Sequence, residues 1–140
     1  MSTKVTTVWK EGMLFESVNP TGDSLYINDG TQMSDKDVYS PKALMLSSLA
    51  GCSGLDVVSL FKKMKLEVGE FRIDIKSELT EEHPRFYDKT RVEYHFHGSN
   101  LHEEKLQKCV NLSVERYCGV MEMFRRFSEM EIVTVFHHSN

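Results

Sequence analysis

The chain has 140 residues, of which 40% are hydrophobic and 27% charged, and its formal net charge is −4 at pH 7. This length predicts a single domain over residues 1–140, and the composition excludes a disordered or collagen-like chain. The acidic balance argues against a dedicated nucleic-acid-binding protein, because such proteins neutralise phosphates with an excess of Lys and Arg.

The N-terminal part is expected to be extended. Three apolar segments within residues 4–28 are separated by turns that contain Gly and Pro, and this pattern predicts a three-stranded meander. Trp9 and Phe15 lie on opposite arms of the first hairpin, where they either join a core or cover a pocket. A polar loop is expected over residues 30–40.

A long helix is predicted next. Ser40 and Pro41 form a typical helix start, and apolar residues then recur at helical spacing to about Lys65,. The breadth of the apolar face predicts a central, buried helix. The small residues between Ser47 and Gly54 favour a kink or a tight packing contact, because each helical Gly costs about 1 kcal/mol relative to Ala.

Neither a transmembrane span nor a signal peptide is expected. The most apolar stretch, residues 43–50, is interrupted by serines and is far shorter than the roughly 20 residues that a span requires,. A cytoplasmic protein without a membrane partner is therefore predicted.

The remaining elements complete an α+β chain. Strands are predicted over residues 70–79 and 86–98, helices over 102–117 and 120–127, and a final strand over 131–138. The resulting order is β-β-β-α-β-β-α-α-β. Short turns join the strands that are adjacent in sequence, so largely antiparallel sheets are expected.

The second of these strands alternates in polarity. Tyr94 and Phe96 belong to its apolar face, and Glu93, His95 and His97 to its polar face. Period-two spacing would suit a metal on one sheet face. Because the alternating partners are apolar, this face is predicted to be the solvated one. The chain contains neither a CxxC nor an HExxH motif, so no metal or cofactor is expected.

The three cysteines differ in their surroundings. Cys52, in the central helix, is either a small core residue or a reactive thiol in an apolar pocket. Asp56 shares its face and could accept a proton, but its charge would raise the pKa of the thiol. Cys118 is either a buried junction residue or a thiolate favoured by the following helix N-terminus and by Arg116. Cys109 lies on an apolar stripe and is predicted to be core.

Spacing indicates which cysteines can act together. If residues 109–118 were one helix, Cys109 and Cys118 would lie about half a turn out of phase and face opposite sides. An odd number of cysteines is also a poor disulfide framework. Cys52 with Cys118 is therefore the better candidate for a joint function.

Three segments carry a family resemblance. They are SPKALML…GCSGLDVVS around Cys52, HPRF before the second strand of the C-terminal half, and SVERYC ending at Cys118. Together they resemble the OsmC/Ohr family over residues 5–136. The resemblance implies an intertwined homodimer in which curved sheets surround two central helices and each site uses residues from both subunits.

The resemblance also implies a function. It is thiol-dependent reduction of small, mainly organic, hydroperoxides in oxidative-stress defence, with a dithiol reductant and no cofactor. Cys52 would be the peroxidatic thiol and Cys118 the resolving thiol.

The chain departs from the family pattern at two places. Lys42 stands where the peroxidases carry Glu, and there is no Arg before Arg72. Lys42 or Arg116 would then have to supply the cation beside the thiolate. The alternative function is a non-peroxidase, either a binder of small apolar ligands or a redox sensor.

Overall fold

The computed structural model describes residues 1–31 and 37–140. The chain forms two compact units, Met1–Ser47 and Ser48–Asn140. Helices and strands occur in an α+β arrangement with two sheets, as predicted. A single domain over the whole chain stays a prediction.

The N-terminal unit contains the predicted meander. Strands β1 (Thr6–Glu11), β2 (Leu14–Val18) and β3 (Ser24–Ile27) pair antiparallel in sequence order. A further strand, β4 (Val38–Tyr39), pairs parallel with β3. The prediction of a loop over residues 30–40 is wrong at β4, because two residues are too few to show a periodicity; residues 32–36 lie outside the described part.

Trp9 and Phe15 are cross-strand neighbours on β1 and β2. Their exposed fractions are 63% and 38%, so neither belongs to a core formed within this chain. The Trp9 Nε1–H donates to the carbonyl of Gly12 at 2.9 Å. The first hairpin therefore presents aromatic surface.

Helix α1 (Pro41–Lys63) begins where predicted. Its first hydrogen bond runs from the Leu44 N–H to the Ser40 carbonyl at 3.0 Å. The expectation of a central, buried helix is wrong for the single chain, because α1 has an exposed side on which Leu55 is 76% exposed. The buried residues form one stripe at intervals of four: Leu49, Ser53, Val57 and Phe61.

Gly54 explains part of the small-residue segment in α1. A Cβ atom at Gly54 would lie 3.3 Å from the Ile73 Cδ1, whereas one at Gly51 would have no neighbour within 4 Å. The expected tight contact is therefore present at Gly54. By length and composition alone, α1 would also pass as a membrane-spanning helix, contrary to the sequence analysis; core helices of globular proteins pass the same test.

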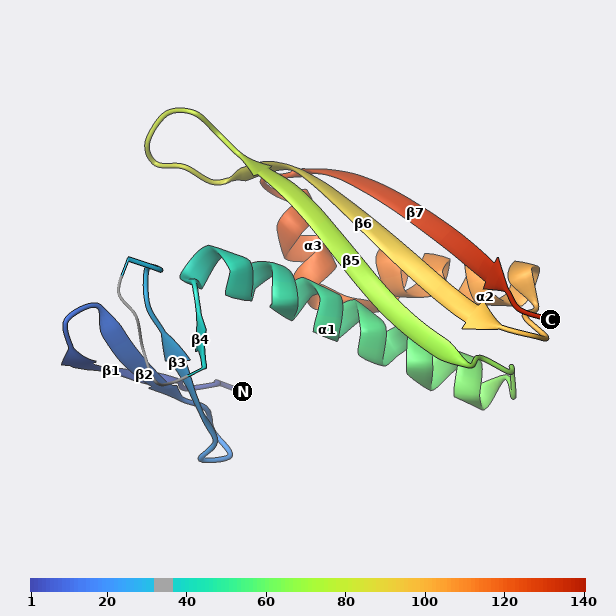
Figure 1. The fold of residues 1–140 in the computed structure, drawn as a ribbon, viewed down its shortest axis with the longest axis horizontal. Coiled ribbons are helices and arrows are strands. Elements are labelled where there is room, and N and C mark those ends of the chain that lie inside the picture. Colours follow the sequence, from blue (N-terminus) through green and yellow to red (C-terminus); the bar gives the residue numbers. More distant parts are fainter. Residues whose placement is uncertain (32–36) are drawn as a thin grey trace. The chain divides into compact units, whose positions relative to one another are not determined.

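The second unit is built on a three-stranded sheet. Strand β5 (Glu70–Leu79) pairs antiparallel with β6 (Tyr87–Gly98), and β6 pairs parallel with β7 (Glu129–His138). The parallel pair arises because helices carry the chain back between β6 and β7. These helices and the C-terminal part of α1 lie on the same face of the sheet (Figure 1).

The connection between β6 and β7 is not one continuous α-helix. It consists of α2 (Glu103–Leu112), a π-helical turn η1 (Ser113–Tyr117) and α3 (Gly119–Arg125). The Cys118 N–H donates to the Ser113 carbonyl at 2.9 Å, five residues back. The wider turn changes the phase of the helix, and Tyr117 in this turn is exposed.

Aromatic rings fill the space between sheet and helices. The Phe96 ring, which is fully buried, stacks on Phe71 with centroids 4.8 Å apart and on Phe136 at 5.7 Å. Phe61 of α1 meets the Phe96 ring edge-on at 6.5 Å. One ring of β6 thus joins all three strands to α1.

We expect Phe96→Ala to lower the free energy of unfolding by about 3–5 kcal/mol, because it leaves a cavity among these rings. Urea denaturation at one fixed protein concentration measures the change. The matched control is Phe86→Ala at an exposed position, which should stay within about 0.5 kcal/mol of the parent. Equal effects at the two positions would contradict this account of the core.

Candidate functional site

Two of the three thiols, those of Cys52 and Cys118, lie near each other. Cys52 lies on α1 and is partly exposed, whereas Cys118 follows η1 and is 4% exposed. The Cys52 side chain lies close enough to the Cys118 thiol to raise its pKa. The Cys109 Sγ instead lies 3.6 Å from the Met64 Sδ in the core, as predicted for a structural residue.

The predicted separation of Cys109 and Cys118 rested on a continuous helix, which the π-turn interrupts. Both thiols are buried, so the phase argument does not hold. Their different neighbours, Met64 for Cys109 and Cys52 for Cys118, separate them instead.

Burial dominates the chemistry of Cys118. Burial, the neighbouring Cys52 and the Asp56 carboxylate raise its pKa to about 11, although its sulfur accepts a hydrogen bond from the Met121 N–H at 3.3 Å. Of the two alternatives for Cys118, the raised pKa supports the buried junction residue over the favoured thiolate. Desolvation outweighs one N–H bond and the dipole of a seven-residue helix,.

A chain of buried hydroxyl groups lies beside the thiols. The Ser53 Oγ is 2.5 Å from the Tyr94 hydroxyl and 2.7 Å from the Ser113 Oγ. The Ser113 hydroxyl donates to the Asp56 Oδ2 at 3.1 Å. Because an ionised carboxylate only accepts, each hydroxyl donates to the next in the order Tyr94, Ser53, Ser113, Asp56.

The chain of hydroxyls has electrostatic consequences. Burial raises the pKa of Tyr94 to about 12, and the nearby Cys118 and Asp56 contribute to that increase. The phenol therefore stays protonated at neutral pH and remains the terminal donor. Asp56 is the only charged member of this chain of hydrogen bonds, and it raises the pKa of Cys118 as well.

Lys42 and Arg116, the two residues predicted to supply a cation, lie in different compact units of the chain. Lys42 lies exposed in the first turn of α1, within the first unit. Arg116 is exposed on η1, with its guanidinium carbon 5.9 Å from the ring centroid of Tyr117. A surface pocket of about 370 Å³ opens beside Cys118, and Arg116, Tyr117 and Arg125 line it.

The polar face of β6 is not simply solvated. His95 is only 8% exposed, and the Glu93 side chain is equally enclosed. Hydrogen bonds from Arg91 and His95 lower the pKa of Glu93 to about 2. The prediction of a wet face is wrong here, because carboxylates of two strands gather around His95.

Sequence reasoning missed the roles of Ser53, Tyr94 and Ser113. Tyr94 was predicted only as a member of an apolar face, and all three residues are buried. The available signal was their hydroxyl groups, since a buried polar group needs a partner. Which partner each hydroxyl finds depends on the approach of α1 to β6 and η1, which periodicity does not reveal.

The fold and the two neighbouring thiols define a class of α+β proteins with paired cysteines. Comparisons with known proteins identify the family. The OsmC-like protein family matches residues 34–133. Protein YhfA of Escherichia coli strain K12 is 30% identical over 118 residues, covering 84% of this chain and 86% of that protein. The chain therefore belongs to the OsmC-like protein family.

Solved structures show the same fold. A hypothetical protein from Aquifex aeolicus VF5 has a TM-score of 0.87 at 26% identity, covering 100% of this chain and 99% of that one. The organic hydroperoxide resistance protein OhrB of Bacillus subtilis has a TM-score of 0.64 at 17% identity, with coverages of 96% and 98%. The latter likeness concerns the fold.

We expect Asp56→Asn to lower the pKa of Cys118, because it removes a negative charge that disfavours the thiolate. Cysteine labelled with carbon-13 at Cβ, followed by NMR against pH in the reduced protein, reports the midpoint. In the parent, the midpoint should lie well above the ordinary value of about 8.5.

The matched control is Asp74→Asn on the opposite face of the sheet, which should leave the midpoint unchanged. An unchanged midpoint in Asp56→Asn, or an ordinary midpoint in the parent, would contradict the electrostatic account.

Proposed function

We propose that the protein is a thiol-dependent reductase of small organic hydroperoxides. Cys52 is the attacking thiol, Cys118 the resolving thiol and an external dithiol the reductant. The observation that carries this proposal is the proximity of a partly exposed thiol to a buried one. The name of the similar Bacillus subtilis protein, an organic hydroperoxide resistance protein, supports the substrate class.

The difference in burial supports the division of roles. A thiol whose pKa is about 11 is ionised to only about one part in ten thousand at pH 7, so Cys118 is a poor first attacker. Cys52 is the more exposed of the two and is the thiol that a peroxide reaches first. Cys118 then reacts only after Cys52 has been oxidised.

The proposed reaction has three steps. The Cys52 thiolate attacks the outer oxygen of the peroxide, the O–O bond breaks, and the alkoxide leaves as an alcohol after taking a proton. The resulting Cys52 sulfenic acid is attacked by the Cys118 sulfur, which forms a disulfide and releases water. Two thiol–disulfide exchanges with the dithiol restore both thiols.

Asp56 is proposed as the group that takes the proton from Cys118 in the second step. Its carboxylate lies close enough to raise the pKa of Cys118 and is held by the Ser113 hydroxyl. The negative charge of Asp56 disfavours the Cys118 thiolate in the resting protein. The same charge lets Asp56 accept the proton when the Cys118 thiol attacks. Lys42 and Arg116 remain the proposed cations for Cys52.

The proposed assembly is an intertwined homodimer. The single chain leaves large apolar side chains exposed in both units, among them Val8, Trp9, Met45 and Leu55. A 23-residue helix that buries one stripe of four residues has apolar surface to spare. A second copy with the same exposed surface would cover it symmetrically.

We expect one equivalent of cumene hydroperoxide to remove two hydrogens from the reduced protein, and peptide digestion to locate the new bond between Cys52 and Cys118. Intact mass spectrometry without reductant makes the measurement. Cys118→Ser should instead stop at a Cys52 that has gained one oxygen, while Cys109→Ser should behave like the parent.

An unchanged mass would overturn the peroxidase and favour the alternative ligand-binding protein. Disulfide formation without repeated turnover in the presence of a dithiol would favour the redox sensor.

We expect the parent chain to sediment at about twice its mass of 16.2 kDa, and Leu55→Glu to sediment as a monomer, because a buried unpaired charge costs several kcal/mol. Analytical ultracentrifugation distinguishes the two states. Met123→Glu, at another exposed apolar position on α3, is the control and should stay dimeric. A parent that sediments as a monomer contradicts the dimer.

A further inference from the structure

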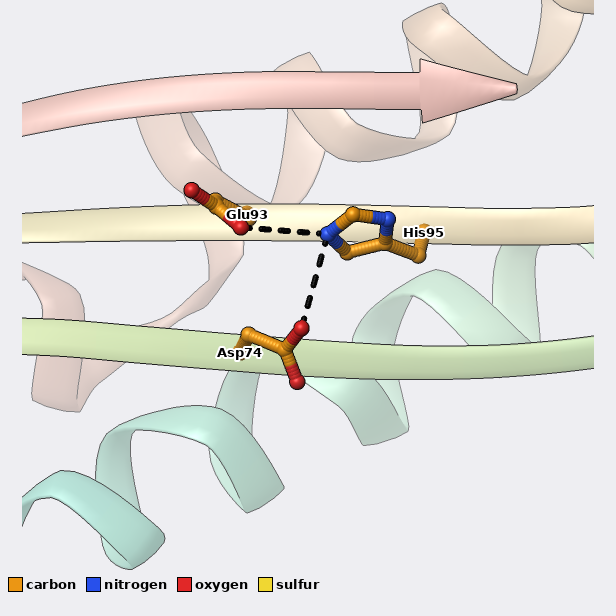
Figure 2. A group of neighbouring side chains, drawn as sticks. All are labelled: Asp74, Glu93 and His95. Atoms are coloured by element: carbon orange, nitrogen blue, oxygen red, sulfur yellow. Dashed lines mark hydrogen bonds and ion pairs between the residues drawn. The ribbon is translucent and has the colours of Figure 1, made fainter. Parts of the chain in front are cut away.

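The face of the β5–β7 sheet turned away from the helices carries a group of metal-ligand side chains. Asp74 of β5 and Glu93 of β6 are directly opposite each other across the strands. His95 lies two residues beyond Glu93 and therefore on the same face. The three side chains converge on one point between the strands (Figure 2).

The distances match the coordination geometry of a small divalent ion. The His95 Nε2 lies 3.2 Å from the Glu93 Oε1 and 3.5 Å from the Asp74 Oδ2, and all three ligand atoms lie within 4.8 Å of one another. Tetrahedral ligands at the usual metal distance of about 2.1 Å are about 3.4 Å apart. An ion could therefore bind with small shifts of the side chains.

The surroundings of His95 also suit a ligand. Its Nδ1 lies 2.8 Å from the His137 Nε2, and the two rings stack with centroids 5.1 Å apart. A metal-binding imidazole characteristically has a hydrogen-bond partner on its other nitrogen, which fixes the ring orientation. The ring is already held with its Nε2 toward the carboxylates.

The basic side chains around the site contact only some of its carboxylate oxygens. Arg91 and Lys76 contact the Glu93 Oε2, which is the oxygen turned away from His95. Arg72 contacts the Asp74 Oδ2 at 3.2 Å, so an ion at the site would share that oxygen with Arg72 or displace it. Carboxylates directly opposite across two strands repel each other, and an ion between them would offset that repulsion.

We propose that Asp74, Glu93 and His95 form a binding site for a divalent first-row transition-metal ion such as Zn²⁺. One nitrogen and two carboxylate oxygens suit that class better than Mg²⁺ or Ca²⁺, which prefer oxygen ligands alone. Three protein ligands leave at least one coordination position to water. The site lies on the opposite face of β6 from Tyr94 and the thiols, so it does not rest on the proposed peroxidase.

Cobalt(II) is the probe, because its absorption reports the ligands that hold it. Titrating Co²⁺ into the reduced, tag-free full-length protein should give one equivalent bound per chain, with weak visible bands. Glu93→Gln and Asp74→Asn should each weaken binding at least tenfold, and His137→Phe should weaken it by about tenfold through loss of the partner of His95.

Two controls make the result specific. Glu131→Gln changes a neighbouring exposed carboxylate that pairs with Arg91, and its affinity should stay within about twofold of the parent. Cys52→Ser/Cys118→Ser should leave the spectrum unchanged. Circular dichroism confirms that each variant is folded, and Asp74→Asn at a partly exposed position keeps the test valid if Glu93→Gln does not fold.

The proposal is overturned by any of three results. These are no binding at millimolar Co²⁺, an intense near-ultraviolet thiolate band that disappears in the double cysteine variant, and parent-like affinity in both Asp74→Asn and Glu93→Gln.

Discussion

The hydrogen-bonded chain from Tyr94 through Ser53 and Ser113 to Asp56 determines how three elements meet. It joins β6, α1 and η1 at a point where none of the hydroxyls is exposed to solvent. A buried hydroxyl without a partner costs about 1–3 kcal/mol, so the three elements can approach only in an arrangement that satisfies all of them. Cys52 directly precedes Ser53 and Cys118 lies five residues after Ser113. The same constraint therefore brings the two thiols together.

The π-turn is the second condition for that meeting. In a continuous α-helix the phase of Ser113 and Cys118 would differ by more than a quarter of a turn, and burial of one would turn the other away from the sheet. The hydrogen bond from the Cys118 N–H to the Ser113 carbonyl spans five residues and brings both side chains inward. Tyr117, exposed as a consequence, lines the pocket beside Cys118.

Periodicity was sufficient to predict most elements. The alternation in residues 70–79 gives the bounds of β5, and Ser40-Pro41 gives the start of α1. The two-residue strand β4 and the π-turn were missed because each depends on a few hydrogen bonds that leave no repeat in the sequence. The sequence left two alternatives open for Cys118 for a different reason: local sequence reveals the helix start but not the burial that raises the thiol pKa.

Strand β6 shows why one face of a sheet could be predicted and the other could not. Most of its inward residues are apolar and are placed by burial, so alternation predicts them. The outward residues depend on the register with β5 and β7, which sets Asp74 opposite Glu93 and His137 opposite His97. A slip of one residue would exchange the two faces, placing Tyr94 among the charges and Glu93 beside the buried hydroxyls. The aromatic core thus fixes the register, and that register places the Tyr94 hydroxyl and the group formed by Glu93 and His95 on opposite faces of one strand.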